Sequence, residues 1–125
     1  MKFLAEKGTL LNGLQTISGA VANKSTLPIL MNILLEAEDG TLTMTATDLE
    51  ISIQQQVETT IDEEGSCTIP AKKFQRLIKE LPSPDTRLSF KTHDDRAEID
   101  VEETNSEFQL PILPPDEFPS LPEVE

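Results

Sequence analysis

The chain has 125 residues, of which 37% are hydrophobic and 26% are charged, and its formal net charge at pH 7 is −13. This length allows one domain with its own core, and no apolar run approaches the ~20 residues that a membrane helix needs. The first residues lack the long apolar stretch of a signal peptide, because Glu6 and Lys7 interrupt it, so we expect a cytoplasmic protein. A net negative charge is also untypical of a DNA-binding domain.

The hydrophobic pattern predicts the same order of elements twice: a strand, a helix and three further strands joined by tight turns. In the first half we assign a strand, a helix and three strands to residues 1–7, 9–22, 27–37, 41–46 and 48–57. In the second half the same elements fall at residues 66–71, 71–81, 86–92, 96–102 and 106–113. We therefore predict an α+β domain of two pseudo-symmetric β-α-β-β-β units, with two helices on one side of antiparallel sheets.

The C-terminal stretch is rich in proline, because residues 111–125 hold five of the nine prolines. Proline fixes φ, removes an amide donor and keeps the chain extended. We therefore assign residues 1–113 to the domain, and residues 114–125 to a closing segment and the start of a linker to a second domain. A frayed natural terminus is the alternative interpretation.

The second predicted helix, residues 71–81, holds four of the ten basic residues of the chain. At 100° per residue its apolar residues form one stripe, and Lys72, Arg76 and Lys79 lie on the opposite face. Lys73 lies on the flank between the two faces. This geometry predicts a basic row that points away from the sheets.

The first predicted helix is free of acidic residues, since no Asp or Glu occurs between Lys7 and Leu35, and Lys24 follows this helix. The acidic residues gather in the predicted strands, in the loops and in the C-terminal stretch. A solvated helix face often carries Lys and Arg, which is the simpler interpretation of the basic row. The alternative is a surface that neutralises the phosphates of a polyanion without reading its bases.

The sequence contains no motif for catalysis or for a cofactor: no phosphate loop, no GxGxxG, no HExxH and no paired-cysteine zinc spacing. Cys67 lies in a predicted strand and is expected to be a small core residue. His93 is expected to be a solvated turn residue, and Asp94 and Asp95 are expected to be solvated charges. We therefore expect no cofactor, no metal and no enzymatic activity.

Four segments resemble a known family: STLPIL, LLEAEDGTLTMTATDLEISI, TIPAKKFQRLIKELP and FQLPILPPDEFPSLPEVE. They are similar to the first domain of the bacterial sliding clamp, the DNA polymerase III beta subunit, and the similarity runs over essentially the whole chain. The resemblance implies the DNA-clamp fold and no enzymatic activity. Clamps of this family are head-to-tail dimers of three-domain chains that close around duplex DNA and keep the polymerase on its template. The polymerase and the clamp loader would bind later domains, and the isolated first domain would be a monomer.

The resemblance also assigns individual residues. Lys24, Lys72 and Lys79 match basic positions that would face DNA through contacts independent of sequence, and Arg76 joins them because it lies on the same helix face. The residues that would lie at the ring-closing interface are Lys73, Asn105, Glu107, Phe108 and Leu110.

The predicted interface departs from the family at two of these positions. Some relatives carry arginines where this chain has Asn105 and Glu107, and those arginines would pair with acids on the third domain of the partner. Either the charges of the partner differ as well, or closure depends on Phe108, Leu110 and Lys73.

Two other functions are compatible with the composition. A free-standing acidic interaction protein, such as a DNA mimic that binds basic partners, would place its function on residues 94–107 and the C-terminal stretch. A hydrolase that uses Asp94 and Asp95 has less support, because nothing in the sequence supplies metal ligands or perturbs these carboxylates.

Overall fold

The structure is a computed structural model, and it describes residues 1–22 and 27–119. Within these ranges the chain forms nine strands, two α-helices and three short 3-10 helices. In chain order they are β1 (Lys2–Glu6), α1 (Lys7–Ile17), η1 (Ser18–Ala20), η2 (Pro28–Met31), β2 (Asn32–Glu38), β3 (Thr41–Thr47), β4 (Ser52–Glu58), β5 (Thr60–Glu63), β6 (Gly65–Pro70), α2 (Ala71–Lys79), β7 (Arg87–His93), β8 (Arg96–Val101), β9 (Ser106–Pro111) and η3 (Pro115–Glu117).

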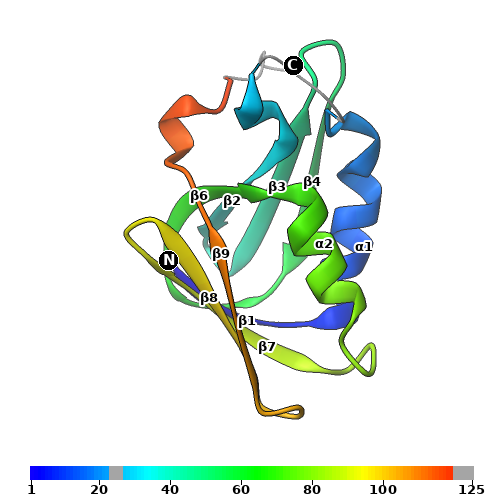
Figure 1. Ribbon diagram of the computed structural model, residues 1–125, viewed down its shortest axis with the longest axis vertical. Coiled ribbons are helices and arrows are strands. Elements are labelled where there is room, and N and C mark those ends of the chain that lie inside the picture. Colours follow the sequence, from blue (N-terminus) through cyan, green and yellow to red (C-terminus); the bar gives the residue numbers. More distant parts are fainter. Residues whose placement is uncertain (23–26, 120–125) are drawn as a thin grey trace.

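The strands form two antiparallel sheets, with the orders β5-β1-β7-β8-β9 and β4-β3-β2-β6 (Figure 1). Each sheet combines three consecutive strands of one half with the first strand of the other half, and β5 of the first half adds the fifth strand at the edge of the larger sheet. Strand β1 pairs with β7, and β6 pairs with β2. This exchange joins the two halves into one domain and confirms the predicted α+β fold with its doubled unit.

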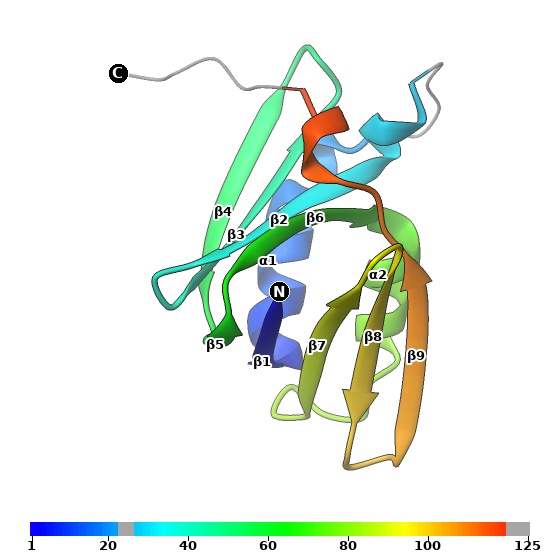
Figure 2. The same cartoon turned by 90° about the vertical axis from the view of Figure 1, so that its left-hand side faces the viewer.

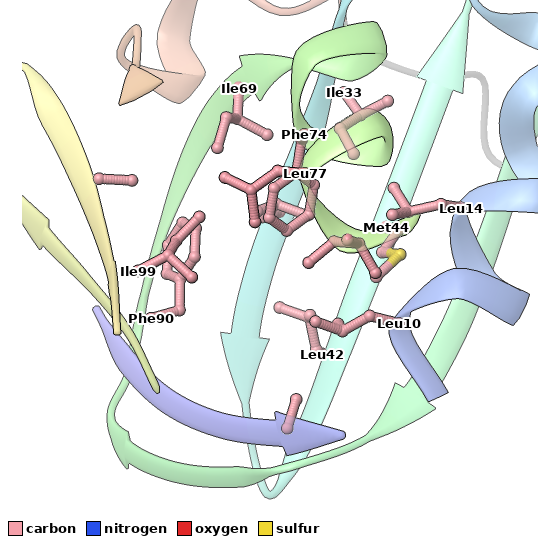
Figure 3. Close-up of a cluster of buried hydrophobic side chains, with 14 of the residues drawn as sticks. Leu10, Leu14, Ile33, Leu42, Met44, Ile69, Phe74, Leu77, Phe90 and Ile99 are labelled. Carbon is pink, nitrogen blue, oxygen red and sulfur yellow. The ribbon is translucent and has the colours of Figure 1, made fainter. Parts of the chain in front are cut away.

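Both helices lie on the same side of the sheets, as predicted (Figures 1 and 2). Leu10 and Leu14 of α1, and Phe74 and Leu77 of α2, point into a shared interior (Figure 3). Phe90 on β7 links the layers, because its ring lies 6.0 Å from the ring of Phe74, edge to face, and stacks at 4.8 Å on the ring of Phe3 in β1. The core thus connects α2 directly to the five-stranded sheet.

The predicted strand over residues 27–37 is wrong in its first part. Residues Pro28–Met31 form the 3-10 helix η2, in which the Leu30 amide donates to the Leu27 carbonyl at 3.0 Å, and the strand begins at Asn32. Proline suits the first position of such a turn because its φ is already fixed and its missing N–H would have no partner there. The apolar run therefore covers two elements.

The first helix is shorter than predicted at its C-terminal end and longer at its N-terminal end. It begins at Lys7 and ends at Ile17, and the 3-10 helix η1 continues the chain to Ala20. The second helix ends at Lys79, with Glu80 as its C-cap, and Leu81 packs in the core beyond it.

One strand of the structure is absent from the prediction. Strand β5 pairs with β1 at the edge of the five-stranded sheet, and Ile61 is its only large apolar residue. Its other side chains include Asp62 and Glu63, and charged residues on a short edge strand are a common protection against edge-to-edge association. The same residues remove the apolar alternation that would predict a strand.

The chain remains packed on the domain beyond β9. Leu113 and Thr68 exchange backbone hydrogen bonds of 3.0 and 2.9 Å, and Phe118 is buried. A domain boundary after residue 113 remains a prediction.

In the described part of the chain, neither helix is long and apolar enough to cross a membrane.

Candidate nucleic-acid interface

Helix α2 separates its apolar and basic side chains onto opposite faces, as its spacing predicts. Ala71, Phe74, Leu77 and Ile78 are its buried residues. Lys72, Lys73, Arg76 and Lys79 are all exposed. Among residues 1–22 and 27–119 no salt bridge involves any of these four cations. Their charges are therefore available to a ligand.

Three of the four cations line one groove. It has a volume of about 430 Å³ and lies where the start of α2 meets η2. The residues that line it are Ala22, Pro28, Met31, Asn32, Pro70, Lys72, Lys73 and Arg76. The structure thus brings Lys73 together with Lys72 and Arg76, whereas Lys79 lies at the other end of the helix. Lys24 lies outside the described residues.

Helix α1 presents an uncharged face beside this basic row. Its exposed side chains include Asn12, Gln15 and Thr16, and the hydroxyl of Thr16 donates to the Asn12 carbonyl at 2.9 Å. A small cavity of about 190 Å³ lies between the two helices, lined by Leu14 and other residues of both. The helical layer therefore combines a neutral face of α1 with the basic face of α2.

Lys7 is a further cation of this layer, and the sequence pattern does not indicate it as a site residue. Its ammonium group donates to the Lys79 carbonyl at 3.1 Å and to the Leu81 carbonyl at 2.7 Å. No sequence signal could have indicated this contact, because its partners lie more than seventy positions away along the chain. Lys7 thus lies at the end of α2 that carries Lys79.

The predicted ring-interface residues of the second half lie on and beside β9, the outer strand of the five-stranded sheet. Phe108 and Leu110 are half-buried and pack against the core, and Glu107 is exposed. Asn105 lies in the preceding turn with a positive φ of 51°, a conformation that Asn tolerates better than most residues. Lys73 comes from a separate element, so the predicted interface combines a helix flank with a sheet edge.

Acidic side chains gather on the sheet layer near this edge. Carboxylate oxygens of Glu98, Asp100 and Glu107 lie within 4.8 Å of one another. The Gln109 side-chain amide donates to the Glu107 carboxylate at 3.3 Å. The predicted interface position Glu107 therefore lies in a locally negative surface.

The residues considered for catalysis lie in two places, a buried position in β6 and the exposed end of β7 with the turn that follows it. Cys67 is 3% exposed, and burial raises its pKa to about 12, which confirms the expected core residue and leaves almost no thiolate. His93 is exposed at the end of β7, where its Nε2 lies 3.7 Å from a Glu98 oxygen. Asp94 and Asp95 form the exposed β7–β8 turn.

Comparisons with known proteins agree with this architecture. Residues 1–122 match the family described as DNA polymerase III beta subunit, N-terminal domain. A beta sliding clamp of Vibrio harveyi is 42% identical over 122 residues, which cover 97% of this chain and 82% of that relative. The beta sliding clamp of Haemophilus influenzae is 38% identical over 122 residues, 97% of this chain and 32% of the relative.

Solved structures of sliding clamps are also similar to this chain. A DNA polymerase III subunit beta sliding clamp from Pseudomonas aeruginosa, bound to griselimycin, superposes with a TM-score of 0.91 at 33% identity, over 100% of this chain and 33% of the other. The Caulobacter crescentus pol III beta structure gives a TM-score of 0.91 at 35% identity, over 98% of this chain and 32% of the other.

The domain has two helices on one side of two antiparallel sheets, and each half contributes its first strand to the sheet of the other half. This architecture and the structural relatives define a sliding-clamp domain. The chain belongs to the DNA polymerase III beta subunit family and corresponds to its N-terminal domain. It spans about a third of the length of the Haemophilus influenzae relative and of both solved structures. None of these relatives supports the alternative of an acidic interaction protein or a DNA mimic.

Proposed function

We propose that this domain is part of a ring that encircles duplex DNA and holds a replicative DNA polymerase on its template. The ring is a head-to-tail dimer of longer chains, acts in the cytoplasm and has no enzymatic activity of its own. The polymerase and the clamp loader bind domains beyond this chain, which are reached through residues 114–125. By itself the domain is a monomer, which light scattering at micromolar concentration checks.

The observation that carries this proposal is the charge of the helical layer. In a chain of net charge −13, the exposed face of α2 presents Lys72, Arg76 and Lys79, while α1 has no carboxylate at all. Cations on such a surface neutralise phosphates without reading the bases. This matches the need of a ring that holds every sequence equally and slides over all of them. Lys24 completes the proposed DNA-facing set.

Ring closure is assigned to the edge of the domain that contains β9. An unpaired edge strand is a natural site for a further strand or chain, and Phe108 and Leu110 supply apolar surface there. Lys73 adds a cation from the flank of α2. Because Glu107 lies close to Glu98 and Asp100, the partner surface near β9 is expected to be less acidic than in relatives that carry arginines at this edge.

The test compares two variants of the full-length ring with equal changes in charge. In the first, Lys72, Arg76 and Lys79 are replaced by Glu. In the second, three cations of the sheet layer, Lys2, Arg87 and Lys91, are replaced by Glu. Fluorescence anisotropy measures binding to linear duplex DNA over a range of salt concentrations, and retention on nicked circular DNA measures the loaded ring.

We expect the helix variant to bind DNA more weakly. The slope of the logarithm of its binding constant against the logarithm of the salt concentration should become shallower by about 0.9 for each phosphate that the variant no longer neutralises. The sheet variant should retain most of the slope of the unmodified ring. Equal reductions of the slope in both variants would show that only net charge matters. An unchanged helix variant would refute the DNA-facing assignment.

A further inference from the structure

The start of α1 is joined to the loop that follows α2. The Lys7 amide donates to the Thr86 carbonyl at 2.8 Å, and the Gly8 amide donates to the Pro84 carbonyl at 2.9 Å. The first amides of a helix have no partner within the helix, and the N-cap residue of α1 supplies no side-chain hydrogen bond. The loop after α2 therefore provides the N-terminal cap of α1.

Contacts also run in the opposite direction, from α1 to the end of α2. The Lys7 ammonium group donates to the Lys79 carbonyl at 3.1 Å and to the Leu81 carbonyl at 2.7 Å. The last carbonyls of a helix likewise lack partners within it, and a cation at this end also interacts favourably with the helix dipole. One residue thus provides an amide to the loop and a cation to the helix end.

This end of α2 carries one member of the basic row. Lys79 accepts the bond from Lys7 through its backbone carbonyl, while its side chain is exposed on the outward face. Lys72 lies seven residues earlier, about 10 Å along the helix axis. A change at Lys7 should therefore displace Lys79 and leave Lys72 in place.

We propose that Lys7 is a positioning residue for the DNA-facing surface: it fixes the end of α2 against α1 and so holds Lys79 where it meets a phosphate. This inference rests on the proposed function. It adds a residue that acts through Lys79, and its effect on DNA binding is separable from a general effect on folding.

The test is a pair of double-mutant cycles in the full-length ring. The single variants are Lys7→Met, Lys79→Met and Lys72→Met, and Lys7→Met is also combined with each of the other two. Methionine keeps an unbranched side chain but removes the ammonium donors. The readout is the salt dependence of binding to linear duplex DNA, and thermal unfolding of each variant reports any decrease in stability.

We expect Lys79→Met to reduce the log–log salt slope by about 0.9, the value for one phosphate contact. Lys7→Met should reproduce most of that reduction in the unmodified ring and in the Lys72→Met ring. It should have almost no effect on the slope in the Lys79→Met ring, because the ammonium group that Lys7 positions is already absent there. Lys7→Arg, which keeps a cation with several donors, should restore the unmodified slope.

If Lys7→Met reduced the salt slope as much in the Lys79→Met ring as in the Lys72→Met ring, the proposal would be overturned. Lys7 would then be an independent phosphate contact or a general stabiliser. A decrease in thermal stability with no change in salt slope would also overturn it. If Lys79→Met and Lys72→Met themselves left the slope unchanged, the proposed function would fail, and this inference would fail with it.

Discussion

Helices α1 and α2 occupy equivalent places in the two halves of the domain, but they use their surfaces differently. Helix α1 lies close against the four-stranded sheet, where Gly13 approaches Met44 of β3 and Val57 of β4. Helix α2 inserts Phe74 toward Phe90 of the five-stranded sheet. The outward face of α1 is neutral, whereas α2 carries four exposed cations.

This difference shows that the doubled fold does not require a doubled function. Packing demands only an apolar stripe, which both helices have, and leaves the outward face free to vary. In the proposed ring, phosphate contacts are expected to be weak, and charge on only one of two adjacent helices would limit their number. In that ring, the neutral face of α1 would add no carboxylate to repel DNA.

The largest expected effect concerns how each helix is anchored. Replacing Phe74 with Ala should lower the free energy of unfolding by about 3–5 kcal/mol, because it removes a fully buried ring that packs against Phe90. Leu14→Ala on α1 should cost about 2–5 kcal/mol. Urea unfolding of the 125-residue chain, followed by circular dichroism, measures both.

The matched controls are Lys72→Ala on α2 and Asn12→Ala on α1, which should change stability by less than about 0.5 kcal/mol because both positions are exposed. If Phe74→Ala cost no more than its exposed control, α2 would not be anchored by its aromatic ring. The two helices would then differ only in the charge of their outward faces.

Much of the fold follows from patterns that are local in the sequence. Helix α2 is predictable because its apolar and basic residues each recur at helical spacing. The doubled order of elements is predictable because turn residues separate short alternating strands. Local patterns fail where one residue changes the geometry, as Pro28 does by starting a 3-10 turn inside an apolar run. They also fail where charge hides a strand, as in β5.

The periodicity of apolar residues does not predict which strands pair when they lie far apart in the sequence. Alternation shows which side chains face the core, but it does not show that β1 pairs with β7 or that β6 pairs with β2. The same limit explains why the sequence does not predict Lys7 as a site residue. The basic row itself was predictable because its members lie within a single helix, whereas the contacts of Lys7 depend on how two distant segments meet.

A smaller effect is expected from adding charge to the neutral helix. Asn12→Lys and Thr16→Lys together would place two cations on the exposed face of α1, one turn apart. In the full-length ring they should steepen the salt dependence of DNA binding by up to about 1.8 in the log–log slope, about 0.9 for each new phosphate contact. Anisotropy measures the slope, and single-molecule tracking should show slower diffusion along DNA.

The matched control for that experiment places the same charge on the sheet layer, with Gln54→Lys and Gln56→Lys on β4, whose side chains are also exposed. If both pairs of lysines steepened the slope equally, the surface of α1 would have no special relation to DNA. A flat response to the α1 lysines alone would place this helix farther from the phosphates than α2.

The smallest expected effect tests the close approach of α1 to its sheet. A Cβ atom on Gly13 would lie 2.9 Å from the Met44 sulfur and 3.0 Å from a Val57 methyl carbon, closer than such atoms normally approach. Overpacking of this kind costs about 1–3 kcal/mol, while Gly→Ala within a helix gains about 0.5–1 kcal/mol. We therefore expect Gly13→Ala to destabilise the chain by about 1 kcal/mol in urea unfolding.

Gly19→Ala is the matched control, because no atom lies within 4 Å of its added Cβ. It should change stability by no more than about 0.5 kcal/mol. A Gly13→Ala variant more stable than the unmodified chain would show that Met44 and Val57 give way at no cost. The position of α1 would then depend on its leucines and on the cap from the loop after α2, and the two helices would differ in their outward charge but not in how closely they pack.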